Sequence, residues 1–229
     1  MGWPNNFVQG VYNALGSLIG VSDGAGGQIG LTPTYYWATK PLASAYTGRA
    51  FISDIGGGSI WVSNGTRWYP ENRELILYTL PSSVSGTYGT VAITAQYLMP
   101  AGLLQNGDYL EIINTSSKGG TTTTFSHAVR IGSAGTVADT AINGATTSLP
   151  STTTLMVNGN SRLQRLSATN IKYLGAFWNS VGSSTTAIAA DTTVDSMDAE
   201  IYITRTTSTG AALDTATLHE FTIRLIANL

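Results

Sequence analysis

A succession of short strand-like segments from about residue 81 to the C-terminus places the strongest constraint on the fold. Several of them alternate apolar and polar residues, as in 201–205 and 221–225, which is the period of a strand with one buried face. Clusters of Gly, Ser, Thr and Asn separate the segments, and no helical pattern intervenes. We therefore predict an all-β fold, with a jelly-roll-like antiparallel β-sandwich over residues 81–229. The predicted strands are 91–98, 109–113, 128–131, 155–157, 171–177, 200–205 and 220–226.

Residues 48–80 predict a small β module built around one hairpin. Segments 49–53 and 60–63 are strand-like, and Asn64-Gly65 follows the second of them. Asn-Gly is a strong hairpin signal because both central positions of a type I′ turn need positive φ. A two-residue loop there sets Trp61 opposite Trp68, an aromatic cross-strand pair that adds up to about 1 kcal/mol. Trp61, Asn64, Gly65 and Trp68 are thus the predicted structural hairpin.

Residues 1–47 predict an N-terminal anchor followed by a linker. Apolar residues recur at spacings of three and four within residues 1–22, which predicts a helix with one apolar face. Glycines within the segment make such a helix marginal by itself, so it needs a surface to pack against. That surface is either its own domain or another protein, and the glycine-rich spacer at 24–30 favours the second. The predicted anchor residues are Phe7, Val11, Leu15 and Leu18.

The segment before the hairpin module combines prolines with aromatic residues. Pro33 and Pro41 bracket Tyr35, Tyr36 and Trp37, and two prolines this close disfavour a regular helix or a central strand. The pattern predicts an extended linker whose aromatic rings pack on a neighbouring surface. Sugar binding by the aromatic cluster is the alternative.

Charged residues make up only 10% of the chain, against roughly a quarter in an ordinary domain. The net charge is −2 and the basic residues are scattered, which argues against nucleic-acid and acidic-membrane partners. No apolar run reaches the ~18–20 residues that span a bilayer, so membrane insertion is not expected. A monomer with so few charges tends to associate, which favours a symmetric oligomer.

Few titratable groups are available for chemistry. His127 beside Ser126, with Asp108 upstream, lacks the Gly-x-Ser-x-Gly turn of a hydrolase nucleophile. His219 fits a surface or interface position. The chain has no cysteine, which excludes thiolate metal ligands. We predict no catalytic residue, cofactor or metal.

Four acidic residues cluster just before the penultimate predicted strand and at its first residue. Paired carboxylates of a glycosidase stand roughly 5–9 Å apart in a groove, and acids at this spacing also suit a calcium loop. The full calcium-loop signature is absent, so a solvated acidic turn is the favoured interpretation. The four are Asp191, Asp195, Asp198 and Glu200.

Two parts of the chain resemble virion proteins of tailed bacteriophages. Residues 48–54 (GRAFISD) and 59–68 (SIWVSNGTRW) resemble a small β module of their tail-fibre and related proteins. Residues 99–112 (MPAGLLQNGDYLEI), with 129–132 and 135–136, resemble the jelly-roll domains that end many of them. The resemblance implies a homotrimer mounted on a virion. Heptads, collagen triplets and β-helix repeats are missing, so a short appendage fits better than a long fibre.

The expected function is that of a structural virion protein, a short trimeric tail-fibre or appendage involved in host-surface attachment. Its N-terminus would contact other virion proteins, and exposed loops at 116–124 and 146–154 would contact a host surface glycan. The alternative is a capsid decoration protein of head-fibre or cement type. A polysaccharide depolymerase is a third candidate that the acid-poor sequence disfavours.

Overall fold

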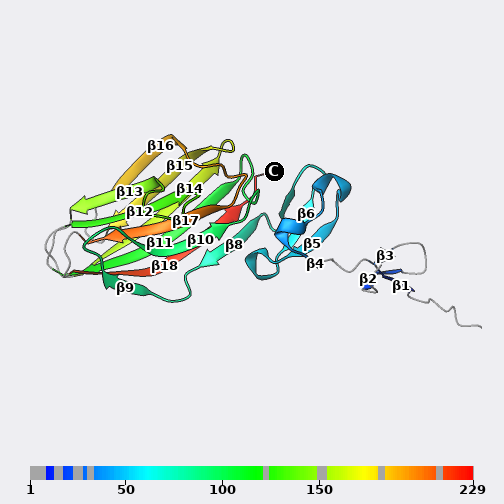
Figure 1. Cartoon of the computed structure of the whole chain (residues 1–229), viewed down its shortest axis with the longest axis horizontal. Helices are drawn as coiled ribbons and strands as arrows, with labels where there is room; N and C mark the ends of the chain where they lie inside the picture. Colours follow the sequence, from blue (N-terminus) through cyan, green and yellow to red (C-terminus); the bar gives the residue numbers. More distant parts are fainter. Residues whose placement is uncertain are drawn as a thin grey trace, which may run out of the picture. The chain divides into compact units, whose positions relative to one another are not determined.

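The computed structural model describes residues 9–12, 18–22, 28–29, 34–120, 124–148, 154–179, 184–209 and 214–228. Within these ranges the chain is all-β apart from short 3-10 helices, as predicted (Figure 1). It forms two compact units, residues 1–71 and 72–229. The division therefore differs from the expected boundaries at residues 47 and 80. The reason is strand pairing, because residues 34–35 pair within the first unit and residues 74–79 within the second.

The N-terminal segment contains strands where a helix was expected. β1 (Gln9–Tyr12), β2 (Leu18–Ser22) and β3 (Gln28–Ile29) form an antiparallel sheet in that order. Val11 lies opposite Gly20 across β1 and β2, so the helical prediction is wrong for these residues. Glycine weakens helices and valine favours strands, and these propensities outweigh the apolar spacing. Val11 lies in β1 and Leu18 in β2, whereas Phe7 and Leu15 lie outside the described residues.

The rest of the first unit is a four-stranded sheet with an aromatic core. Its strands, in order, are β4 (Thr34–Tyr35), β5 (Ala50–Ser53), β6 (Ile60–Ser63) and β7 (Trp68–Pro70). Three 3-10 helices accompany them: η1 (Trp37–Thr39), η2 (Ala43–Ala45) and η3 (Ile55–Gly57).

Buried aromatic rings hold this module together. Trp37 and Trp61 have ring centroids 4.5 Å apart, and Phe51 meets Trp68 edge-on at 4.6 Å. The expected linker thus belongs to the module where it is described, and Trp37 packs in its core. Tyr36, by contrast, is exposed.

The hairpin exists, but its register is shifted by two residues from the predicted one. Ser63 lies opposite Trp68 and Trp61 opposite Pro70, so the predicted Trp61–Trp68 pair is wrong. The loop is four residues long and closes with a bond from the Asn64 N–H to the Arg67 carbonyl. The cause is the Asn64 side chain, whose oxygen accepts from the backbone N–H groups of Thr66 and Arg67, each at 3.0 Å. Gly65 does have positive φ, at 90°.

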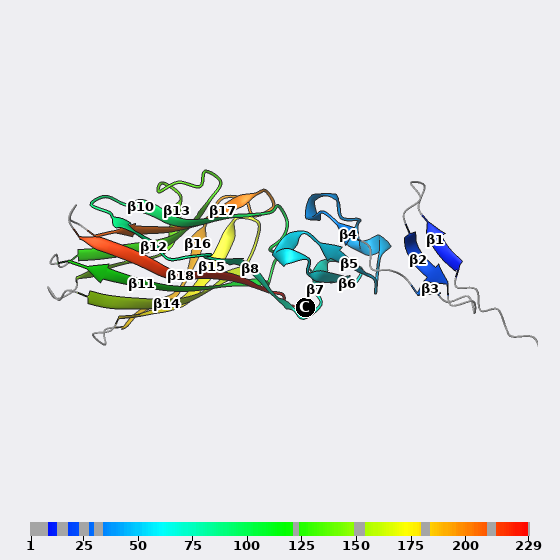
Figure 2. The same ribbon diagram turned by 90° about the horizontal axis from the view of Figure 1, so that it is seen from below.

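The second unit is a sandwich of two antiparallel sheets (Figures 1 and 2). Strands β10, β17, β12 and β13 form the small sheet in that order, and the large sheet has the order β16-β15-β14-β11-β18-β8, with β9 also paired to β18. Their bounds are β8 (Glu74–Thr79), β9 (Val84–Thr87), β10 (Ala92–Met99), β11 (Tyr109–Gly119), β12 (Thr124–Gly132), β13 (Thr140–Ser148), β14 (Thr154–Arg165), β15 (Asn170–Asn179), β16 (Ser184–Thr193), β17 (Ile201–Ser208) and β18 (Thr215–Ile226).

This topology is that of a jelly roll. The strands β9-β18-β11-β14 of one sheet face β10-β17-β12-β13 of the other, and β15 and β16 extend the first sheet. Each predicted strand is present, and the predicted sandwich is confirmed. The Thr-rich segments are more extended than expected: β11 runs to residue 119, and β13 and β16 lie in segments with no predicted strand. Threonine is β-branched and favours extended backbone, although its polarity hides the strand pattern.

Candidate recognition end of the sandwich

The ends of many strands meet at one end of the sandwich, on the left in Figure 1. Gly119 is opposite both Thr154 and Thr215, and Thr124 is opposite Ser148. β15, β16 and β17 also reach this end. We call it the loop end, because it borders both segments predicted to bind, 116–124 and 146–154. The opposite end, bordered by residues 100–108 and 194–200, is called the base.

The inward side chains of β11 and β17 change from apolar at the base to polar toward the loop end. Alternate residues of a strand face the same side, and on β11 the inward series begins with Leu110 and Ile112. The series continues along β11 with Asn114, Ser116 and Lys118. β17 repeats the change, with Ile201 and Ile203 followed by Arg205, Thr207 and Thr209. These side chains are all buried, so β11 and β17 contribute polar groups to the interior at the loop end, where Phe125, Ala216 and Leu218 of the neighbouring strands are also buried.

A buried ion pair joins two strand ends at the loop end. The Lys118 ammonium lies 3.0 Å from the Asp214 carboxylate, and the side chains are only 2% and 4% exposed. Lys118 also donates to the Gly120 carbonyl at 3.4 Å. Gly120 has φ near +111°, and a Cβ there would overlap the Asp214 carboxylate. The pair thus fixes the end of β11 to the residue before β18.

Arg205 connects the two sheets beneath the loop end. Its side chain is fully buried, and it donates to the Thr206 carbonyl at 2.7 Å and to the Ser116 hydroxyl at 3.3 Å. Ser116 belongs to β11 of the large sheet and Arg205 to β17 of the small one. Burial lowers the pKa of Arg205 to about 9, because the charged form loses its hydration.

His127 is a buried residue within β12, which begins four residues before the predicted strand 128–131. Burial, and then the charge of Arg205, hold the pKa of His127 well below its usual range, so the ring is neutral at pH 7. Asp108 lies at the base, where its carboxylate accepts from the backbone N–H groups of Gln105 and Asn228, each at 3.0 Å. Ser126 pairs with Ser208 near the loop end. Ser126, His127 and Asp108 therefore form no triad.

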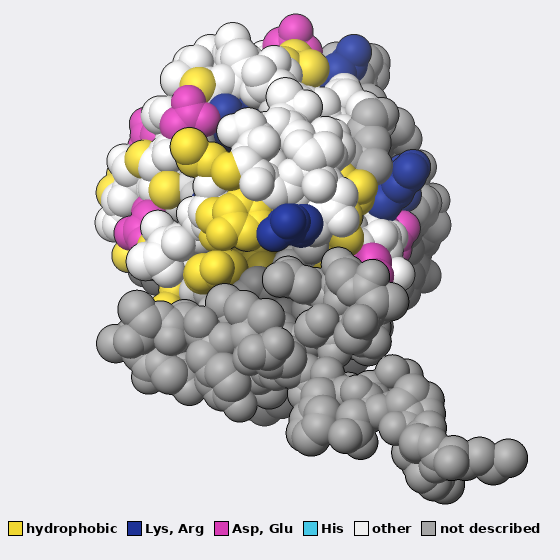
Figure 3. Space-filling view, turned by 90° about the vertical axis from the view of Figure 1, so that its right-hand side faces the viewer, with side chains coloured by type: hydrophobic (Ala, Val, Ile, Leu, Met, Phe, Trp, Pro, Cys, Tyr) yellow, Lys and Arg dark blue, Asp and Glu magenta, His cyan; other side chains and the backbone are white. Residues whose placement is uncertain are grey.

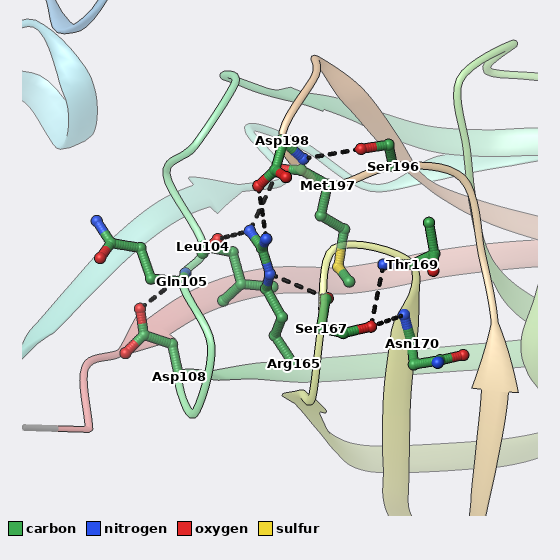
Figure 4. Close-up of polar contacts among 10 residues, drawn as sticks. All are labelled: Leu104, Gln105, Asp108, Arg165, Ser167, Thr169, Asn170, Ser196, Met197 and Asp198. Carbon is green, nitrogen blue, oxygen red and sulfur yellow. Dashed lines mark hydrogen bonds and ion pairs between the residues drawn. The ribbon is translucent and has the colours of Figure 1, made fainter.

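Figure 4 shows the polar contacts that residues of the stretch 99–112 make at the base. Arg165 donates to the Asp198 carboxylate at 2.6 Å, to the Ser167 carbonyl at 3.1 Å and to the Leu104 carbonyl. Leu103 and Leu104 are buried and close the apolar core. These bonds hold the loop before β11 against the loop before β17, so the stretch has a structural role here.

Three of the four clustered acids have different neighbours. Asp195 accepts from the Ser133 hydroxyl and backbone N–H, both at 2.6 Å, and these bonds lower the pKa of Asp195. Asp198 pairs with Arg165, and Asp191 lies opposite Lys172. Across the described ranges, no group of three or more His, Asp or Glu side chains is arranged to hold a metal ion. No helix in the described part of the chain is long and apolar enough to cross a membrane.

Hydroxyl groups line the outer face of the large sheet close to the loop end. The Ser85 and Thr217 hydroxyls lie 2.7 Å apart, and the Ser117 hydroxyl lies 2.7 Å from Nε2 of His219. Thr115 donates to the Glu220 carboxylate at 3.3 Å. We call these residues of β9, β11 and β18 the hydroxyl strip. His219 is exposed on it, as the sequence led us to expect.

A row of charges crosses the same face nearer the base. Glu111 lies 3.4 Å from Arg162 and 3.2 Å from Arg224, and Arg224 lies 3.9 Å from Glu74. Cross-strand neighbours of opposite charge stabilise the sheet. Elsewhere charged groups are few and scattered, as Figure 3 shows for one face of the molecule.

Sequence reasoning missed Lys118, Arg205 and Asp214. A signal was present for Arg205, because the alternation that places Ile201 and Ile203 inward also places Arg205 inward. We did not predict it to be buried, since charged residues are seldom buried unless paired.

No protein-family model matches the chain, and the comparison with curated proteins gave no match. Among solved structures, the comparison found "Structure of infectious bursal disease virus Gx strain" at 13% sequence identity and a TM-score of 0.27. The match covers 69% of this chain and 42% of that one, so this chain spans less than half of that protein's length. A similarity at this level carries no weight for fold or function.

Proposed function

We propose that this chain is a structural virion protein without enzymatic activity, a short homotrimeric appendage of the tailed-bacteriophage type that attaches to the host surface. The observation that carries the proposal is the loop end, where the strand ends gather around the buried Lys118–Asp214 ion pair. Recognition residues are commonly carried on loops that a rigid scaffold positions. The resemblance of residues 48–68 and 99–112 to phage virion proteins supports the same assignment.

A neutral host glycan is the ligand that the loop end suits best. The hydroxyl strip offers donors and acceptors with little charge, which matches the hydroxyl groups of a sugar. Binding would combine this strip with the loops that border it.

The test of host attachment is binding of the labelled chain to host cells. Replacing Ser117 and Thr217 together with Ala should reduce binding several-fold. The control is Thr193→Ala, which removes an exposed hydroxyl from the base end of β16 and should leave binding unchanged. Equal loss in both variants, or no binding by the wild-type chain, would contradict glycan recognition at the loop end.

Attachment to the particle is assigned to the N-terminal segment with Phe7, Val11, Leu15 and Leu18. A chain beginning at Leu31 keeps β4 and the aromatic core of the first unit. It should stay folded and trimeric, and it should fail to bind virions that lack the native protein. If the shortened chain unfolds or still assembles on the particle, the anchor assignment is wrong.

Capsid decoration is the second candidate, because a jelly roll anchored at one end suits a head-fibre or cement protein equally. The position of the protein on the particle separates it from a tail appendage. Depolymerase activity is tested by a reducing-sugar assay on host polysaccharide. The proposal predicts no release, and sustained release by purified chain would overturn it.

A further inference from the structure

The edge strands on one long side of the sandwich expose apolar side chains and contain no charged residue between Leu75 and Gly107. The large sheet ends on this side with β8 and β9, and the small sheet ends with β10. The rings of Tyr78 on β8 and Tyr97 on β10 lie 5.9 Å apart, so the two edge strands are neighbours. We call residues 75–99 the neutral side. Its large apolar residues with 40% to 52% exposure are Ile76, Val91, Ile93 and Leu98.

The absence of charge along the neutral side is a property of the sequence. From Leu75 to Gly107 the chain contains no Asp, Glu, Lys or Arg. Ile76 lies opposite Arg224 of the charge row, so the exposed apolar residues away from charge are Val91, Ile93 and Leu98, on β10 or directly before it. Exposed apolar residues scattered singly need no explanation, but several along one edge strand mark a contact surface.

β10 adds an unprotected backbone edge. It pairs with β17 on one edge, and no strand of the described residues pairs with the other. Proteins usually protect such an edge with lysine, proline or a very short strand, because its free N–H and C=O groups attract another chain. β10 has eight residues and contains neither lysine nor proline, and a β-bulge interrupts only its first half, between Ile93 and Ala95.

We propose that copies of this chain contact one another through the neutral side, which faces the symmetry axis of the homotrimer. This inference rests on the oligomer of the proposed function and adds which surface forms it. The lack of charged residues on these strands favours an uncharged partner surface. A charged partner surface would lose hydration here and find no counter-charge. A second copy brings the same uncharged side, and closed symmetry covers it in all copies at once.

The first test places a charge on the neutral side and a matched charge elsewhere. Leu98 and Leu166 are both 40% exposed, and Leu166 lies between β14 and β15, away from β10. Leu98→Lys should reduce the mass measured by light scattering from three chains to one. Leu166→Lys should leave it at three, and circular dichroism should show both variants folded.

The second test does not depend on stability and uses the absence of cysteine from the chain. Leu98→Cys, treated with a short bismaleimide cross-linker, should give covalently linked chains on a denaturing gel. Leu166→Cys, treated in the same way, should remain as single chains.

The outcomes separate this inference from the proposed function. A trimer that survives Leu98→Lys and gives no cross-link through Leu98→Cys would overturn the neutral side as the interface, and virion attachment would stand. A wild-type chain that is monomeric at micromolar concentration would overturn both the interface and the homotrimer. A dimer that Leu98→Lys dissociates would keep the surface and overturn the threefold arrangement.

Discussion

β11 and β17 contribute apolar side chains to the sandwich interior at the base and polar side chains at the loop end. At the base, β11 and β17 contribute Leu110, Ile112, Ile201 and Ile203 to an apolar core. At the loop end, the same strands contribute a buried lysine, a buried arginine and hydroxyl groups. Apolar cores tolerate substitutions of similar volume, whereas polar interiors require each partner in its place. The base therefore supplies stability, and the loop end supplies a fixed geometry beneath the loops.

Breaking the buried ion pair should cause the largest loss of unfolding free energy. Lys118→Met leaves the Asp214 carboxylate buried without its ammonium partner, which should cost about 3–5 kcal/mol of unfolding free energy. Urea denaturation measures it. Adding Asp214→Leu should recover most of the loss, because the double variant leaves no unpaired charge at this position. A single variant as stable as the wild type would show that the loop end does not depend on this pair.

A cavity at the base should lower the unfolding free energy slightly less than breaking the buried ion pair does. Ile203→Ala removes fully buried methyl groups and should lower the unfolding free energy by about 2–5 kcal/mol. Ile203→Val is the control and should cost only about 0.5–1.5 kcal/mol. If Ile203→Ala lowered host-cell binding without lowering stability, the division of roles between the base and the loop end would be wrong.

The buried polar groups toward the loop end should make stability depend on pH. The folded state keeps His127 neutral, while the unfolded chain takes up a proton below the usual histidine pKa of about 6.5. Stability should therefore fall as pH falls from 7 to 5, by up to ~1.4 kcal/mol per pH unit below 6.5. His127→Gln should flatten this slope. Urea midpoints at several pH values measure it, and an equal slope in both proteins would assign the dependence to other groups.

Removing a charge from the surface charge row should cause the smallest loss of unfolding free energy. Arg162 pairs with Glu111 on the outer face and its side chain is 55% exposed. Arg162→Ala should cost about 0.2–1 kcal/mol, because water screens the exposed Arg162 guanidinium and Glu111 keeps Arg224 as a partner. The loss should shrink further in high salt, whereas the loss in Lys118→Met should not. Similar salt dependence in the two variants would contradict the buried character of the Lys118–Asp214 pair.

The fold was predictable to the extent that apolar alternation reports strands. Segments such as 201–205 and 221–225 identified the sandwich, and the structure confirms it. Threonine-rich strands such as β13 and β16 were missed because their residues lack the apolar half of the pattern. The Asn64-Gly65 turn was located correctly, but its register depends on side-chain bonds of Asn64 that a turn signature does not specify.

The site was less predictable than the fold. Strand ends far apart in the sequence meet at the loop end only through the jelly-roll topology. No local sequence pattern therefore predicts that these residues lie together. Asp214 is one example, because its partner Lys118 lies nearly a hundred residues earlier. The prediction of an N-terminal helix was wrong for a different reason. Apolar residues spaced three and four apart can also occur in short strands rich in valine and glycine.

The most direct test of the central claim is electron microscopy of virions whose copy of this protein carries a gold-labelled tag at the C-terminus. We expect the label on the outside of intact particles, at the sites of a short appendage, with up to three labels at each site. Deletion of the residues before Leu31 should remove the label while the tagged chain remains soluble and folded. Intact infectious particles that carry no label, although the tagged protein is produced and folded, would contradict the assignment to the virion.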